Sequence, residues 1–113
     1  MQKDDLVRLL HMLDAASEAV SFLAGKSRAD LDTNRMLVLS LVKDIEMIGE
    51  AASKVSLETR KECGKIPWLD IVDMRNHLIH AYFDIDLNIV WDTITTDLPP
   101  LIKELEKILE GAK

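Results

Sequence analysis

The sequence predicts an all-α protein: an antiparallel four-helix bundle with one short extra helix and a kinked last helix. Three observations point to this class. Apolar residues recur three and four positions apart over long stretches, which is the spacing of one helix face. Aromatic residues make up only 4% of the chain, so aliphatic side chains and methionine form the core. Three prolines and four glycines leave few turns, which favours long helices with short connections.

The first helix is expected to begin at Asp4 and Asp5, as capping residues, and to end at Gly25. The polar connector KSRADLDTN follows, with room for a short helical turn. The apolar positions of the second helix are Val38, Leu41, Ile45, Ile48, Ala52 and Val55. Gly49 lies among larger residues there and costs about 1 kcal/mol relative to alanine, which predicts a close approach of another helix.

Three further elements complete the predicted bundle. Ser56 is expected to cap the short extra helix LETRKEC, which Gly64 ends. The stretch from Trp68 to Tyr82 should open as an amphipathic helix. Asp86 is expected to cap the last helix, whose apolar phase continues through Pro99-Pro100, so we expect one long helix with a proline kink.

Size and charge limit the classes of protein that this chain can be. The 113 residues contain no linker-like segment, which predicts a single domain over residues 1–113. A formal charge of −6 disfavours broad binding to nucleic acid or an anionic membrane but permits a local phosphate pocket. Cys63 is the lone cysteine, and there is no signal peptide or membrane-length apolar run. We therefore expect a soluble, cytoplasmic protein without a membrane partner.

Chemistry-bearing residues are concentrated between Arg75 and Tyr82. Ile71, Val72, Leu78 and Ile79 are the helical neighbours of Arg75, so the guanidinium should project from an apolar face and be either paired or aimed at an anionic ligand. His80 lies five positions on, about 140° around an ideal helix. The two side chains meet only if the helix loosens near its end, or if a neighbouring protomer supplies one of them.

Should they meet at a phosphodiester, the three polar residues have complementary chemistry. Arg75 can grip two phosphate oxygens and stabilise the charge of a pentacoordinate transition state. His80 can take the proton of a ribose 2′-hydroxyl or protonate the leaving oxygen. Asn76 could orient the imidazole or donate to the phosphate. Such a set suffices for metal-free RNA cleavage through a cyclic phosphate, which DNA would resist.

The residues from Arg75 to Tyr82 match the R-x4-H-x-Y pattern of HEPN-domain proteins, and the chain resembles their HepT branch. IGEAA in the second helix, IPW before the motif and LPPL in the last helix extend the resemblance over essentially the whole chain.

The resemblance implies a HEPN-like helical bundle that forms a homodimer with the motif helices facing each other. It implies a metal-independent ribonuclease, without cofactor, that acts as the toxin of a toxin–antitoxin pair. The usual antitoxin is a minimal nucleotidyltransferase that adds AMP to the motif tyrosine. Carried over, Arg75 and His80 are the catalytic pair, Asn76 assists and Tyr82 is modified. Apart from the resemblance, His77 and Glu50 are candidate assisting residues, although His77 also fits a residue of the polar helix face.

Other interpretations of the same residues stay open. Arg75 could be a structural partner of Glu46 or Glu50 across the bundle. Asp73, His77 and His80 share a helix face and could hold a metal with further ligands. Two other functions follow from these alternatives. One is a noncatalytic subunit that docks a nucleotidyltransferase and presents a nucleotide or Tyr82 to it, and the other is a purely structural helical dimer.

Overall fold

The computed structural model describes residues 1–81 and 84–112, and for residues 80 and 81 only the backbone. The elements in chain order are α1 (Lys3–Leu23), α2 (Asp30–Thr33), α3 (Arg35–Ser53), α4 (Leu57–Glu62), α5 (Trp68–Val72), α6 (Met74–Leu78), β1 (Ile79–Ala81), β2 (Asp84–Ile85), α7 (Leu87–Asp92), the π-helical segment η1 (Thr93–Asp97) and α8 (Leu98–Gly111). No helix within the described ranges has both the length and the apolar character needed to cross a lipid bilayer.

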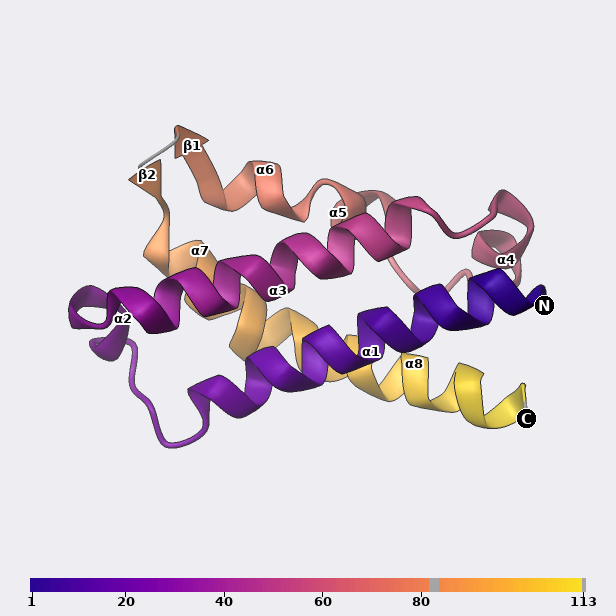
Figure 1. The fold of residues 1–113 in the computed structure, drawn as a ribbon, viewed down its shortest axis with the longest axis horizontal. Helices are drawn as coiled ribbons and strands as arrows, with labels where there is room; N and C mark the ends of the chain where they lie inside the picture. Colours follow the sequence, from indigo (N-terminus) through magenta and orange to yellow (C-terminus); the bar gives the residue numbers. More distant parts are fainter. Residues whose placement is uncertain (82–83, 113) are drawn as a thin grey trace.

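The fold is all-α, as the composition and spacing predict. Helix α1 packs against α3 on one side and α8 on the other. Figure 1 shows α1 and α3 running in opposite directions, with both chain termini at one end of the molecule and α2 and the β1–β2 hairpin at the other. A regular four-helix bundle is not confirmed, because the segment between α4 and α7 consists of two five-residue helices and a short hairpin rather than one long helix.

The core follows the predicted helical stripes. Leu9 and Met12 of α1, Leu41 and Ile45 of α3, and Leu105 of α8 have no measurable exposure. These positions recur three and four residues apart within each helix, so each helix turns one stripe toward a common interior.

Asp4 and Asp5 do not cap α1, contrary to the sequence-based expectation. The capping position is Gln2, and no side chain there makes a capping hydrogen bond. Asp5 is instead buried at 3% exposure. Its carboxylate accepts hydrogen bonds from the hydroxyls of Thr59 and Ser56 at 2.6 and 2.7 Å, and these bonds, that of Thr59 first, hold its pKa below the ordinary value. The residue therefore ties the start of α1 to the start of α4.

The predictions for α3 and α4 are confirmed. Ser56 caps α4, since its side chain accepts a hydrogen bond from the Thr59 backbone N–H. Gly49 lies where another backbone comes close: a Cβ added there would stand 3.3 Å from the Ile71 carbonyl oxygen of α5. The absent side chain at Gly49 thus allows α5 to lie directly on α3.

The last helical stretch runs from Leu87 to Gly111 and changes its winding before the two prolines. Asp86 caps it as expected, with a side-chain oxygen 3.1 Å from the Ile89 backbone nitrogen. Pro99 and Pro100 have no N–H to offer the preceding turn, and their rings crowd its carbonyls. The chain widens there into η1, where the Leu98 N–H donates to the Thr93 carbonyl five residues back. The predicted kink therefore takes the form of a π-helical segment.

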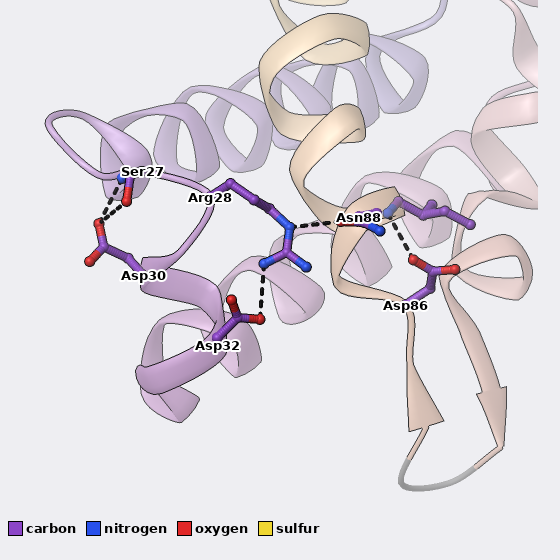
Figure 2. A network of polar contacts seen from close by, with 7 residues as sticks. Ser27, Arg28, Asp30, Asp32, Asp86 and Asn88 are labelled. Atoms are coloured by element: carbon purple, nitrogen blue, oxygen red, sulfur yellow. Dashed lines mark hydrogen bonds and ion pairs between the residues drawn. The ribbon is translucent and has the colours of Figure 1, made fainter.

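A polar network holds the α1–α3 connection against the start of α7 (Figure 2). The Arg28 Nε donates to Asn88 Oδ1 at 2.8 Å, and Arg28 also pairs with Asp32 of α2 at 3.1 Å. Asp30 accepts from the Ser27 backbone N–H at 2.6 Å. Since Asn88 lies three residues after β2, this network supports the base of the hairpin that follows the motif helix.

Candidate functional site

Buried anchors fix the start of the segment that carries the motif. Trp68 is 7% exposed, and its indole N–H donates to the carbonyls of Arg60 and Cys63 at 3.2 and 3.1 Å. The Arg60 guanidinium lies 5.8 Å from the centre of the Trp68 ring and also donates to the Ala52 carbonyl at the end of α3. Helix α5 therefore begins at a position held by both α3 and α4.

The predicted helix through the motif is broken at Asp73. The Asp73 N–H still donates to the Leu69 carbonyl, but the Asn76 N–H bonds the Asp73 carbonyl three residues back, and α6 restarts at Met74. The Asp73 carboxylate also accepts a hydrogen bond from the Asn76 side chain. Aspartate competes with helical hydrogen bonding through such local contacts, which accounts for the break.

Helix α6 ends at Leu78, and Ile79–Ala81 continue as the extended strand β1. Strand β1 pairs antiparallel with β2, with Ile79 opposite Ile85. The backbone of His80 therefore lies in a hairpin, which is the loosened helix end that a meeting of Arg75 and His80 requires. The His80 side chain and all of Tyr82 lie outside the described residues, so their roles stay predictions.

Arg75 does not project from a buried apolar face, contrary to the expectation from its neighbours. Its side chain is 54% exposed, while Ile71 and Leu78 turn into the core. The break at Asp73 changes the helical register, so ideal spacing misplaces Arg75. The Arg75 Nε lies 3.3 Å from Glu46 Oε1 of α3. The predicted ion pair with Glu46 is thus present, whereas Glu50 pairs with Lys54 at 3.1 Å.

Arg75 opens into a groove of about 620 Å³ that α1, α3 and α6 line. Four lysine and arginine side chains line it: Arg8, Lys43, Lys54 and Arg75. Glu46, Glu50 and His11 complete its polar lining. With His11 neutral, the groove carries a net charge of +2, although the whole chain carries −6.

Asn76 and His77, the other motif residues with described side chains, do not line this groove. Asn76 donates to Asp73, and His77 Nε2 lies 3.4 Å from the second oxygen of the same carboxylate. His77 also lines a separate cavity of about 530 Å³ between α5–α6 and η1–α8. The structure therefore brings Arg75 and Glu50 together in one groove and does not bring Asn76 or His77 into it.

No group of three or more histidine, cysteine or acidic side chains that could hold a metal occurs among the described residues. Of the alternative metal ligands Asp73, His77 and His80, the first two are adjacent. The third has no described side chain, so that alternative is not tested.

Most of the residues that line the groove were not predicted from the sequence. Lys43, Met47, Glu50 and Lys54 are spaced four, three and four apart, so they share one exposed face of α3. That spacing was a usable signal. Arg8 and His11 had none, because their place beside this face depends on how α1 packs on α3.

The fold and the site define an all-α protein with an arginine at the junction of a basic groove and a short hairpin. The family model described as Ribonuclease HepT-like matches residues 12–108, and the chain belongs to this family.

Similar proteins carry ribonuclease names. A protein of Methanocaldococcus jannaschii is 34% identical over 110 residues, or 97% of this chain. It is named as a gamma-glutamylcyclotransferase and proposed RNase. The chain spans 50% of that relative's length. A proposed RNase of Caldanaerobacter subterraneus is 34% identical over 93% of this chain and 94% of its own. The "Probable ribonuclease HepT" of Thermococcus cleftensis is 26% identical over 93% and 90%. No solved structure matches the chain.

Proposed function

We propose that the protein is a metal-independent endoribonuclease that acts as the toxin of a toxin–antitoxin pair. One observation carries the proposal: within a HepT-like family match over residues 12–108, Arg75 of the Arg75-x4-His80-x-Tyr82 motif presents an exposed guanidinium to a basic groove. An exposed arginine beside further cations suits a phosphodiester, because the fork of donors matches two phosphate oxygens.

The contact with Glu46 leaves Arg75 able to bind phosphate. Its closest approach to Glu46 is through Nε, and no described residue accepts a hydrogen bond from the guanidinium. The terminal nitrogens therefore keep donors for an incoming phosphate, while the carboxylate limits how far the side chain swings. In the proposed reaction His80 accepts the proton of the ribose 2′-hydroxyl as the 2′-oxygen attacks phosphorus. The bond from phosphorus to the 5′-oxygen breaks, and the imidazolium of His80 returns the proton to that 5′-oxygen. The products are a 2′,3′-cyclic phosphate and a 5′-hydroxyl.

The proposed control is modification of Tyr82 by a partner nucleotidyltransferase. The transfer joins the tyrosine oxygen to the α-phosphate of ATP and releases pyrophosphate. A bound adenylate would add a negative phosphodiester and a bulky nucleoside two residues from His80, where the RNA backbone must lie. The modification would therefore silence the nuclease by charge and by volume.

Unmodified protein in a chelator-containing buffer provides the test. It should cleave RNA but not DNA of the same sequence and should leave cyclic-phosphate ends. Arg75→Ala and His80→Ala should each lose at least about 100-fold in kcat/KM, within the range that phosphate clamps and general acid–base groups contribute. Lys107→Ala, on the exposed side of α8, is the matched control. Activity that survives His80→Ala would refute the mechanism.

A second candidate function is a noncatalytic subunit that presents Tyr82 or a nucleotide to a nucleotidyltransferase. The Arg75–Glu46 ion pair favours this function, because Glu46 already balances the charge of Arg75 and no anionic substrate is needed to explain the presence of an arginine there. In that case the purified chain would show no RNase activity even when intact-mass measurement finds Tyr82 unmodified. It would still bind nucleotide or the transferase in calorimetry.

A further inference from the structure

Two cations in the groove beside Arg75 have no carboxylate partner among the described residues. Glu50 is engaged by Lys54 and Glu46 by Arg75, at 3.1 and 3.3 Å. Arg8 of α1 and Lys43 of α3 line the same groove without an ion pair to any described carboxylate. Unneutralised like charges facing one groove repel each other, so an anionic ligand would stabilise the arrangement.

We propose that this groove binds the sugar–phosphate backbone of single-stranded RNA, with Arg8, Lys43 and Lys54 contacting phosphates beyond the one that Arg75 grips. The inference rests on the proposed ribonuclease function and names how its substrate is held. From Lys43 to Lys54 is eleven residues, or about 16 Å of helix. That length spans several phosphates at the ~3.4 Å axial spacing of a stacked strand.

The residues that line the groove indicate which part of an RNA it would contact. The described lining contains no phenylalanine, tyrosine or tryptophan, and His11 supplies its one ring, so it has no row of aromatic side chains on which successive bases could stack. The donors available are lysine and arginine heads, which match phosphate oxygens irrespective of base identity. Binding should therefore tolerate different sequences and weaken steeply with salt.

The proposal is tested with a short 2′-O-methyl RNA, which has the backbone of RNA but cannot be cleaved through its 2′-oxygen. Its affinity is measured by fluorescence anisotropy between 50 and 200 mM salt. Lys43→Ala and Arg8→Ala should each weaken binding by about 3- to 10-fold and make the log–log salt slope shallower by about 0.7 for each phosphate that the variant no longer neutralises. Lys107→Ala should bind as the wild type does. Circular dichroism reports whether each variant is folded, and Lys43 is exposed, so its replacement leaves the core intact.

The outcomes separate this inference from the nuclease proposal. Groove-dependent binding by a protein that cleaves no RNA would support the groove and refute the nuclease. Cleavage with KM unchanged in both groove variants would refute the groove and leave the nuclease standing. Absence of binding, or displacement of the RNA by polyglutamate at equal charge concentration, would overturn the inference; the second result would assign the groove to an acidic protein partner.

Discussion

Glu46 acts on Arg75 in two opposing ways. As the carboxylate 3.3 Å from the Arg75 Nε, it restrains a long side chain that is 54% exposed. As a negative charge lining the groove, it also repels phosphate. Because the pair is largely solvated, its contribution to folding stability should be within about 1 kcal/mol. In the proposed ribonuclease, Glu46 would therefore act as a positioning residue, with its main effect on the reaction rather than on folding.

We predict that Glu46→Gln lowers both KM and kcat for RNA. KM should fall because a negative charge leaves the groove, and kcat should fall about 3- to 10-fold, or roughly 1 kcal/mol, because the guanidinium is held less firmly. Steady-state kinetics on a defined RNA measures the two constants separately. Glu106→Gln, an exposed change on α8, controls for net charge. An unchanged kcat in Glu46→Gln would show that the ion pair does not position Arg75.

Asp44 is a buried acid at the α1–α3 contact that the sequence did not single out. It is 1% exposed, and its Oδ2 has no hydrogen-bond partner among the described residues. Burial, followed by a hydrogen bond with Glu18 and the charge of Glu18, raises the pKa of Asp44 to about 7. The folded protein is therefore more stable with Asp44 protonated than with Asp44 ionised.

We predict that Asp44 makes stability fall as pH rises from about 4 to about 7. Its folded-state pKa lies above its ordinary value of 3.8, so its stabilising proton is retained at low pH and lost as pH passes 7. The slope approaches about 1.4 kcal/mol per pH unit within that window. Asp44→Asn should remove this slope and be more stable than the wild type at pH 8. Urea unfolding of both proteins at pH 5 and pH 8 gives the difference, and equal pH dependences would contradict the assignment.

At the scale of elements, helical periodicity was sufficient for the long helices and insufficient for the motif segment. The stripes of α1 and α3 and the caps at Ser56 and Asp86 depend on local spacing and local hydrogen bonds, which the sequence displays directly. The placement of Arg75 depends on the break at Asp73, and the groove depends on the packing of α1 on α3. An ideal helix assumed through residues 68–82 misplaces Arg75, because one altered turn rotates every later side chain. The groove is not predictable from local spacing, because it needs the tertiary packing of α1 on α3.

We predict that Gly49 tolerates alanine but not valine. An alanine Cβ would stand 3.3 Å from the Ile71 carbonyl, a tight contact that the gain in helix propensity of about 1 kcal/mol offsets. Valine adds two methyl groups against a backbone atom, and overpacking of that kind costs about 1–3 kcal/mol. Chemical denaturation compares the two variants with Gly111→Ala, where an added Cβ meets nothing within 4 Å. A valine variant as stable as the wild type would mean that α5 can move away from α3.

At the scale of the whole molecule, the distribution of charge is more informative about binding to nucleic acid than the net charge is. The chain carries a formal charge of −6 while the groove beside Arg75 carries +2, so the remaining residues together carry −8. In the proposed ribonuclease, the acidic remainder of the chain would repel nucleic acid and the groove would attract it, which would steer a phosphate chain toward Arg75. Exposed Met36 and Leu39, at 81% and 47%, lie on the same helix as the groove, toward its first residues. We propose that a second copy of the chain, which the family resemblance implies, contacts these apolar side chains.

The last prediction concerns the homodimer that the family resemblance implies, and whether each of its active sites takes residues from both protomers. If Arg75 of one protomer works with His80 of the other, a mixture of the inactive variants Arg75→Ala and His80→Ala should recover activity, because each mixed dimer contains one site with both native residues. Random pairing makes half of the dimers mixed with one of two sites intact, so about a quarter of wild-type activity should return. If both residues of a site come from one protomer, no mixed dimer has a complete site and nothing returns. The assay mixes the variants after mild unfolding and measures RNA cleavage, with sedimentation reporting the dimer mass. A recovered mass of twice 12.8 kDa without recovered activity would place each site within one protomer.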